Sequence, residues 1–243
     1  MSKLMDKDST LEALQKGDLT LQGQFLQGSN YTFLAQVDCE DHKYPVVYKP
    51  TRGEQPLWDF PTGTLAKREV VAFKISEALG WDLVPPTIYR RVGPLGAGSV
   101  QLYIEHDATY HYFNFEADDK QRLRPVILFD CLVNNADRKA SHVLIDSTNH
   151  IWLIDHGLCF HTEDKLRTVI WDYAGDRIPE TLREDVRHFL GKLRPGGELP
   201  LDLAHLLRDE EILAMRNRAT RLIDTGCFPL PPTDRRVYPW PPV

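Results

Sequence analysis

The sequence predicts an α+β protein of two lobes, a strand-rich lobe followed by a helical one. With 243 residues, the chain is long for one minimal domain and short for two complete ones. Strand-like segments fill the first half, and apolar residues at helical spacing begin near residue 118. A hydrophobic fraction of 42% is enough to bury a substantial core. We therefore expect one unit whose two lobes share a cleft.

The first lobe is expected to contain five strands and one helix. A small-residue turn at residues 26–30 joins the first two strands into a hairpin, and Pro50, which cannot donate to a ladder, ends the third. A glycine-rich turn at residues 93–98 separates the last two. The strands are expected at residues 19–25, 31–37, 45–49, 87–92 and 99–104.

The helix of the first lobe is expected at residues 65–79. Apolar side chains including Val71, Ile75 and Leu79 form one stripe at helical spacing. Thr64 is suited to cap the start, and Gly80 is suited to the left-handed turn that ends a helix.

The second lobe begins with a helix expected at residues 123–133, followed by a polar run at residues 134–139. Two short strands at 143–145 and 151–154 then form a small hairpin, and residues 179–193 and 203–222 have amphipathic helical patterns. The last 15 residues are proline-rich and are expected to form an extended tail that packs through Trp240. The expected divisions are a leader at 1–18, the first lobe at 19–106, the second lobe at 107–228 and the tail at 229–243.

Composition limits the classes of function and the compartment. The 35 acidic residues outnumber the 29 Lys and Arg residues, which argues against a broadly basic surface for nucleic acids. No segment approaches the roughly 20 apolar residues that span a bilayer, so any lipid substrate would be met peripherally. The four cysteines are widely spaced, which favours reduced thiols, and the first residues do not form a signal peptide. These features predict a cytoplasmic protein.

Three side chains around the small hairpin form the most informative pattern. Asp137 and His142 precede its first strand, and Asp155 directly follows its second. Phosphoryl transfer requires an oriented acceptor and divalent cations that hold the nucleotide phosphates in line. Asp137 is placed to orient or deprotonate an acceptor, while Asp155 is placed to hold a metal. In kinases, a metal-binding Asn lies five residues after the catalytic Asp, and here His142 occupies that position.

Simpler interpretations exist for each of these residues. Asp137 alone could cap a turn, and Arg138 and Lys139 could be solvated loop charges rather than contacts to the transferred phosphate. His142, His156 and His161 do not form a closed zinc set, and no cysteine pair has structural-zinc spacing. The combination of Asp137, His142 and Asp155 favours a site for nucleotide and metal.

The strings NNADRK at residues 134–139 and IDHGLCF at residues 154–160 carry a family resemblance. The chain resembles the phosphatidylinositol 3-/4-kinase superfamily, particularly its type II-like and bacterial members and a small bacterial family with both strings. The likeness covers residues 19–225 in element order. It implies a two-lobed protein-kinase-like fold, with ATP and Mg²⁺ or Mn²⁺ as cofactors.

The resemblance also implies roles for residues of the first lobe. Lys49 would contact the nucleotide phosphates and Glu69 would hold Lys49, with Asp137 as the third catalytic residue and His142 and Asp155 as metal ligands. A phosphate loop and an adenine-contacting linker complete the nucleotide site. Their residues are expected to be Gly28, Ser29, Asn30, Gln101, Tyr103, Ile104 and Glu105.

The expected activity is ATP-dependent transfer of the γ-phosphate to a hydroxyl acceptor. The acceptor could be an inositol-type lipid, a protein or a small alcohol, because a fold does not determine its substrate. His142 motivates an alternative, a catalytically weak pseudokinase that acts as a nucleotide-responsive binding module. A third possibility is a different transfer from ATP, such as nucleotidylation.

Overall fold

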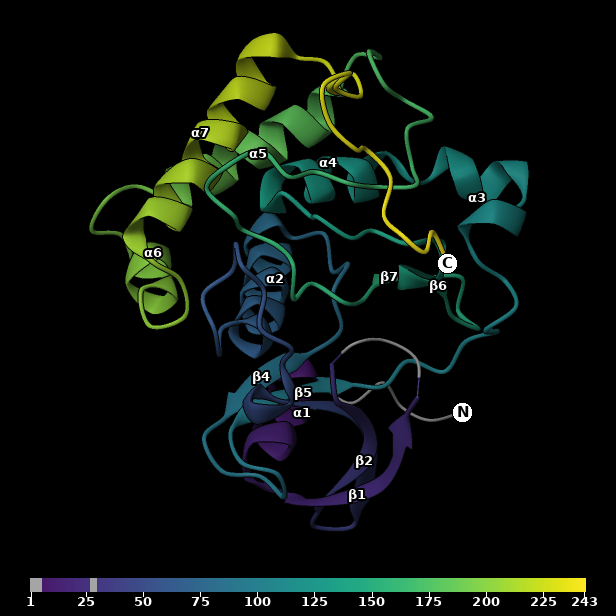
Figure 1. The fold of residues 1–243 in the computed structure, drawn as a ribbon, viewed down its shortest axis with the longest axis vertical. Coiled ribbons are helices and arrows are strands. Elements are labelled where there is room, and N and C mark those ends of the chain that lie inside the picture. Colours follow the sequence, from purple (N-terminus) through teal and green to yellow (C-terminus); the bar gives the residue numbers. More distant parts are fainter. Residues whose placement is uncertain (1–5, 27–29) are drawn as a thin grey trace.

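The computed structural model describes residues 6–26 and 30–243, which form two lobes with helix α2 between them (Figure 1). The first lobe is an antiparallel sheet of five strands in the order β1-β2-β3-β5-β4. All five predicted strands are present, with ends shifted by a few residues. Their bounds are β1 Asp18–Phe25, β2 Thr32–Cys39, β3 His42–Pro50, β4 Thr87–Arg90 and β5 Gly98–Leu102.

Helix α1 (Lys7–Lys16) lies against the sheet, where the sequence predicted only a polar leader. Its buried residues Ala13 and Leu14 share a small core with strand residues such as Val46 and Val100. Arg90 of β4 donates from Nε to the Leu14 carbonyl at 2.7 Å, which satisfies an acceptor at the end of the helix. Two buried apolar residues make too weak a stripe to predict a helix, so the stability of α1 depends on the sheet that it covers.

Helix α2 (Leu65–Leu79) has the predicted bounds, and Gly80 ends it with a left-handed φ of 74°. The predicted capping by Thr64 is wrong, because its hydroxyl donates to the Pro61 carbonyl at 2.7 Å. Glu54, from the loop after β3, caps the helix instead by accepting the backbone N–H of Ala66 at 2.9 Å. A carboxylate at a helix N-terminus also complements the helix dipole.

The second lobe is built around α4 (Arg124–Val133), whose residues from Val126 to Val133 are all buried. The region predicted as one helix at 203–222 is divided, because α6 ends at Leu203 and α7 starts at Asp209. In the described part of the chain, no helix is long and apolar enough to cross a membrane. The remaining elements are α3 Ala117–Gln121, α5 Glu180–Lys192, α6 Glu198–Leu203, α7 Asp209–Thr225, β6 Val143–Ile145, β7 Ile151–Leu153 and the 3₁₀ turns η1 Thr51–Gly53, η2 Tyr112–Asn114 and η3 Ala140–His142.

The proline-rich tail is held by its backbone rather than by Trp240, so that prediction is wrong. Trp240 is 76% exposed. The carbonyl of Val237 accepts the N–H of Thr168 at 3.0 Å, and the carbonyl of Pro242 accepts the N–H of Ala140 at 2.8 Å. The tail therefore crosses the second lobe and reaches the turn η3 (Figure 1).

A buried ion pair fastens α2 to the second lobe. Arg68 donates from Nη2 to Glu211 Oε1 of α7 at 2.5 Å and from Nη1 to the Cys159 carbonyl at 2.6 Å. Burial would raise the pKa of Glu211, but the backbone N–H of Arg208 and the charge of Arg68 outweigh burial and lower it. Removing one partner of a buried pair leaves the other charge without compensation.

Replacing Glu211 with alanine is expected to lower the free energy of unfolding by about 3–5 kcal/mol at neutral pH, as measured by urea denaturation. The loss should shrink as the pH falls through the lowered pKa of Glu211, because protonation removes the pair from the wild type as well. Glu210→Ala, an exposed neighbour, is the control, with an expected change within about 0.5 kcal/mol. Equal effects of the two substitutions would contradict a stabilising role for the pair.

Candidate functional site

Three charged side chains meet where the two lobes face each other. Lys49 comes from the end of β3, Glu69 from the first half of α2 and Asp155 from the loop after β7. Lys49 Nζ contacts Glu69 Oε1 and lies 3.1 Å from Asp155 Oδ1. The second oxygen of Glu69 accepts the backbone N–H of His156 at 2.9 Å. One ammonium group is therefore held by carboxylates from α2 and from the second lobe.

The environment keeps Lys49 charged. Burial by itself would lower the pKa of its ammonium group, but the charges of Asp155 and Glu69 outweigh burial and raise it. A permanently charged ammonium at the end of a strand is a suitable point charge for a phosphate group.

The carboxylate of Asp155 lies between Lys49 and His142, and 48% of the side chain is exposed. Its φ of 61° lies in the left-handed region, which Asp tolerates better than most residues and which is common at functional sites. Desolvation by the surrounding protein would raise the pKa of this carboxyl, but the charge of Lys49 and its hydrogen bond outweigh that effect and hold the pKa well below its usual range. Asp155 is therefore a permanent carboxylate.

His142, the last residue of η3, faces Asp155 across 3.4 Å between Nε2 and Oδ2. Its Nδ1 lies 3.1 Å from the carbonyl oxygen of Asp137 and 3.5 Å from the backbone nitrogen of Lys139; the shorter contact, to a carbonyl that can only accept, places the ring hydrogen on Nδ1. Burial, aided by Arg138 and Lys139, lowers the pKa of His142 to about 4, although Asp155 opposes that shift. At neutral pH, an imidazole lone pair and a carboxylate oxygen thus face each other without a proton between them.

Asp137 lies beside this pair on the loop before η3. Its backbone N–H donates to Asn135 Oδ1 at 2.9 Å, and its Oδ2 lies 3.5 Å from Lys139 Nζ. Burial raises the pKa of its carboxyl to about 6, with Lys139 opposing and the nearby Asp155 adding to the shift. A carboxyl that titrates near neutral pH is suited to accept a proton.

The structure assigns different positions to the two basic residues after Asp137. Arg138 is fully buried and bonds to both carboxylate oxygens of Asp130 and to the carbonyl of Ile154, so the contact with a transferred phosphate considered from the sequence is wrong. Lys139 stays at the edge of the site beside Asp137.

The residues expected to form the phosphate loop and the adenine-contacting linker lie in three places. Gly28 and Ser29 lie outside the described residues, and Asn30 accepts the N–H of Gln55 through its Oδ1 at 2.7 Å. Gln101 is buried in β5, and its side-chain amide donates to Oγ1 of Thr87 on the neighbouring strand β4 at 2.8 Å. The following segment, from Tyr103 to Glu105, leads out of β5 toward the second lobe, as Figure 1 shows.

Sequence reasoning missed the buried polar residues that support the site. Asp130 lies in an otherwise apolar turn of α4, and a buried acid in such a run is itself a signal for a charged partner. His156 is fully buried and lies 2.9 Å, through its Nε2, from Arg138 Nη2. Burial, together with Arg138, lowers the pKa of His156 well below its usual value, so the ring is neutral.

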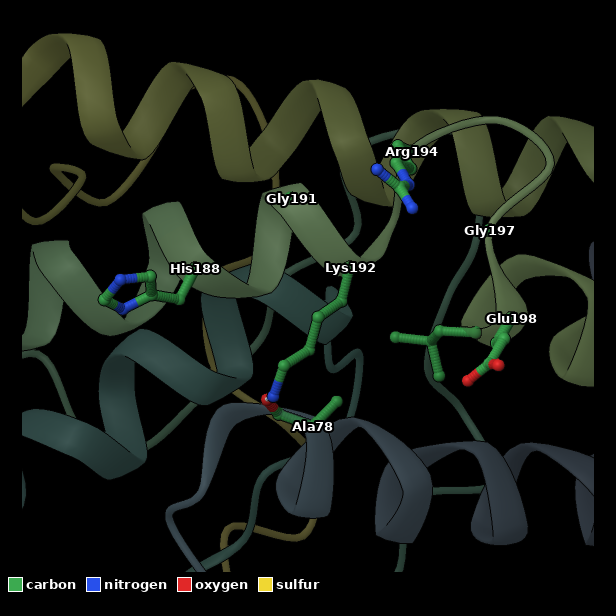
Figure 2. Close-up of a pocket in the computed structure, with 8 residues that line it drawn as sticks. Ala78, His188, Gly191, Lys192, Arg194, Gly197 and Glu198 are labelled. Atoms are coloured by element: carbon green, nitrogen blue, oxygen red, sulfur yellow. The ribbon is translucent and has the colours of Figure 1, made fainter.

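A separate hollow of about 660 Å³ lies at the C-terminal ends of α2 and α5 (Figure 2). Lys192 reaches across it and donates to the Ala78 carbonyl at 2.6 Å, near the C-terminus of α2. None of the expected site residues lines this hollow. Among the residues that the structure describes, no group of three or more His, Cys, Asp or Glu side chains is arranged to hold a metal ion.

Comparison with known sequences identifies two relatives, although no protein-family model matches the chain. Protein Rv2133c of Mycobacterium tuberculosis is 39% identical over 271 residues, an alignment that covers 97% of this chain and 96% of that protein. Phosphatidylinositol 4-kinase gamma 4 of Oryza sativa subsp. japonica is 29% identical over 200 residues. That match covers 68% of this chain but only 35% of the rice protein.

Solved structures with the same fold include a Golgi casein kinase. One crystal structure of it superposes with a TM-score of 0.51 at 13% identity, covering 90% of this chain and 74% of the kinase. A second, with Mn and ADP bound, gives a TM-score of 0.58 at 15% identity, covering 98% and 80% of the two chains. At such low identity the likeness concerns the fold, which is kinase-like, as the sequence predicted.

The carboxyl of Asp137 is expected to titrate with a pKa of about 6 in an NMR titration of carboxyl carbons. Lys139→Met should raise this pKa further, because Lys139 stabilises the carboxylate, while Lys139→Arg should leave it nearly unchanged. A pKa at or below the ordinary Asp value of about 3.9 in the wild type would contradict the buried environment described for Asp137.

Proposed function

Because this chain belongs to the family of Protein Rv2133c, whose name states no activity, we propose its function from the site: it is an ATP-dependent phosphotransferase that moves the γ-phosphate to a hydroxyl acceptor. The observation that carries this proposal is the cluster of Lys49, Glu69, Asp155 and His142 between the lobes. The kinase-like fold and the rice relative named as a phosphatidylinositol kinase support it.

Lys49 is proposed to bind the nucleotide phosphates. Its charge is fixed by two carboxylates, and Glu69 in turn is held by the backbone N–H of His156, so the ammonium group has a defined position. Phosphoryl transfer depends mainly on positioning and charge neutralisation, which such an arrangement provides.

His142 and Asp155 are proposed to hold a divalent cation, Mg²⁺ or Mn²⁺. Their facing atoms, an imidazole lone pair and a carboxylate oxygen 3.4 Å apart, are both acceptors and fit a cation between them. The pKa of about 4 keeps His142 available as a ligand at neutral pH. When bound, the ion would neutralise charge on the phosphates, as expected from a fold shared with a kinase that binds Mn and ADP.

Asp137 is proposed to orient the acceptor hydroxyl and to take its proton. The acceptor oxygen then forms a bond to the γ-phosphorus, the bond from that phosphorus to the β-phosphate oxygen breaks, and ADP leaves. A carboxyl with a pKa of about 6 is ionised at neutral pH and remains basic enough for this role. The acceptor is proposed to be an inositol-type lipid, a protein or a small alcohol.

Asp155→Ala is expected to weaken binding of Mg²⁺ or Mn²⁺ with ATP by at least tenfold in calorimetric titration, because the variant lacks a metal ligand and a partner of Lys49. The matched control is Asp224→Ala, an exposed acid in the last turn of α7, which should bind like the wild type. If Asp155→Ala bound metal and nucleotide as tightly as the wild type, the metal assignment would be wrong.

Asp137→Asn is expected to keep metal-dependent ATP binding and to lose phosphate transfer by a factor of about 10²–10⁴, because the amide cannot accept the proton. Transfer would be followed with γ-labelled ATP, first to water or to the protein itself and then to candidate acceptors. Wild-type binding without any transfer would favour the pseudokinase alternative. In a parallel assay with α-labelled ATP, label on the acceptor or on the protein would instead indicate nucleotidylation.

A further inference from the structure

The ring of His156 connects the buried charges of the second lobe with the site between the lobes. Its Nε2 lies 2.9 Å from Arg138 Nη2. Because a guanidinium group can only donate, Nε2 must be the acceptor, and the single ring hydrogen of a neutral imidazole is then on Nδ1. Arg138 is fixed in turn by both oxygens of Asp130.

The hydrogen on Nδ1 has no acceptor among the described residues, although the atom is fully buried. The nearest carboxylate oxygen is Glu69 Oε2, at 4.0 Å. That oxygen already accepts the backbone N–H of His156 at 2.9 Å. A carboxylate oxygen has two lone pairs and can accept a second hydrogen bond. A shortening of about 1 Å would bring the two atoms to hydrogen-bond distance.

Binding of nucleotide and metal would favour that shortening. Lys49 currently compensates both Glu69 and Asp155. Once a phosphate draws Lys49 toward itself, Glu69 loses part of its compensation, and a buried carboxylate then gains most from another donor. The Nδ1–H of His156 is buried beside it and unpaired.

We propose that His156 is a positioning residue that donates from Nδ1 to Glu69 Oε2 when metal and nucleotide are bound, and so fixes Glu69 against the Arg138–Asp130 pair. This inference rests on the proposed function. It assigns regulation of the site to one buried hydrogen bond: the bond is open in the free protein and closed in the complex. In the complex, Oε1 of Glu69 holds Lys49 at the phosphates, and Oε2 of Glu69 accepts two hydrogen bonds from His156.

The first test is NMR of the wild-type protein labelled with ¹⁵N-histidine, with and without Mg²⁺ and a non-hydrolysable ATP analogue. The His156 ring should be the Nδ1–H tautomer in both states, and its Nδ1–H signal should move downfield and exchange more slowly in the complex. His161 is the internal reference, because its Nε2 and Nδ1 already bond to the Asp59 carbonyl and the Glu163 N–H at 3.0 Å each. Its signals should not change in this way.

A pair of substitutions separates the two ring nitrogens. His156→Asn keeps a donor near the Nδ1 position, and His156→Gln keeps an acceptor near the Nε2 position for Arg138 but has no donor toward Glu69. Nucleotide affinity should fall about tenfold or more in His156→Gln, as expected for a lost hydrogen bond to a charged group, and less than about threefold in His156→Asn. Urea unfolding of both variants would show whether either is merely destabilised.

The outcomes distinguish this inference from the proposed function. An Nε2–H tautomer, or a wild type that binds the nucleotide without a change at Nδ1–H, would overturn the role of His156 and leave the phosphotransferase proposal intact. Equal affinities of the Asn and Gln variants would overturn it as well. Absence of nucleotide binding by the wild type would overturn both.

Discussion

The sharing of one ammonium group by two carboxylates is the interaction on which the site depends. Lys49 comes from β3 and Glu69 from α2, which follows it in the chain, whereas Asp155 comes from the loop after β7, 106 residues after Lys49. The buried Glu69 and the largely buried Lys49 need compensating charges, so the sheet, the helix and the second lobe meet at this point. The relative position of the lobes is thus tied to the charges of the proposed phosphate site.

A second set of buried charges, Arg138 and Asp130, holds the loops that carry His142 and Asp155. Arg138, paired with Asp130, donates hydrogen bonds to the carbonyls of His142 and Ile154 and to Nε2 of His156. The loops before β6 and after β7 therefore share one guanidinium group, which fixes His142 and Asp155 relative to each other. The backbone of the tail adds a further restraint at Ala140, between Asp137 and His142.

The sequence allowed prediction of features that depend on local pattern. The helix at 65–79 and the hairpin of β6 and β7 follow from apolar spacing, and the kinase-like spacing of Asp137, His142 and Asp155 predicted that these side chains lie together. Helix α1 was missed because its stability comes from the sheet. The buried role of Arg138 was missed because three of its partners, Asp130, Ile154 and His156, lie 8, 16 and 18 residues away, and no local pattern reports such contacts. Trp240 was misjudged because the tail is fixed by backbone carbonyls, which every residue has.

The attachment of α2 has a consequence for how the cleft can open. Beyond the Arg68–Glu211 pair, Lys74 bonds to Asp202 at 2.6 Å, and Lys192 of α5 holds the carbonyl of Ala78. These bonds tie α2 to the second lobe, while the helix also packs against β4 and β5 of the sheet, so it connects the two lobes. Because α2 is bonded to both lobes, a relative motion of the lobes would have to break the Arg68–Glu211 pair on one side or the contact of Glu69 with Lys49 on the other.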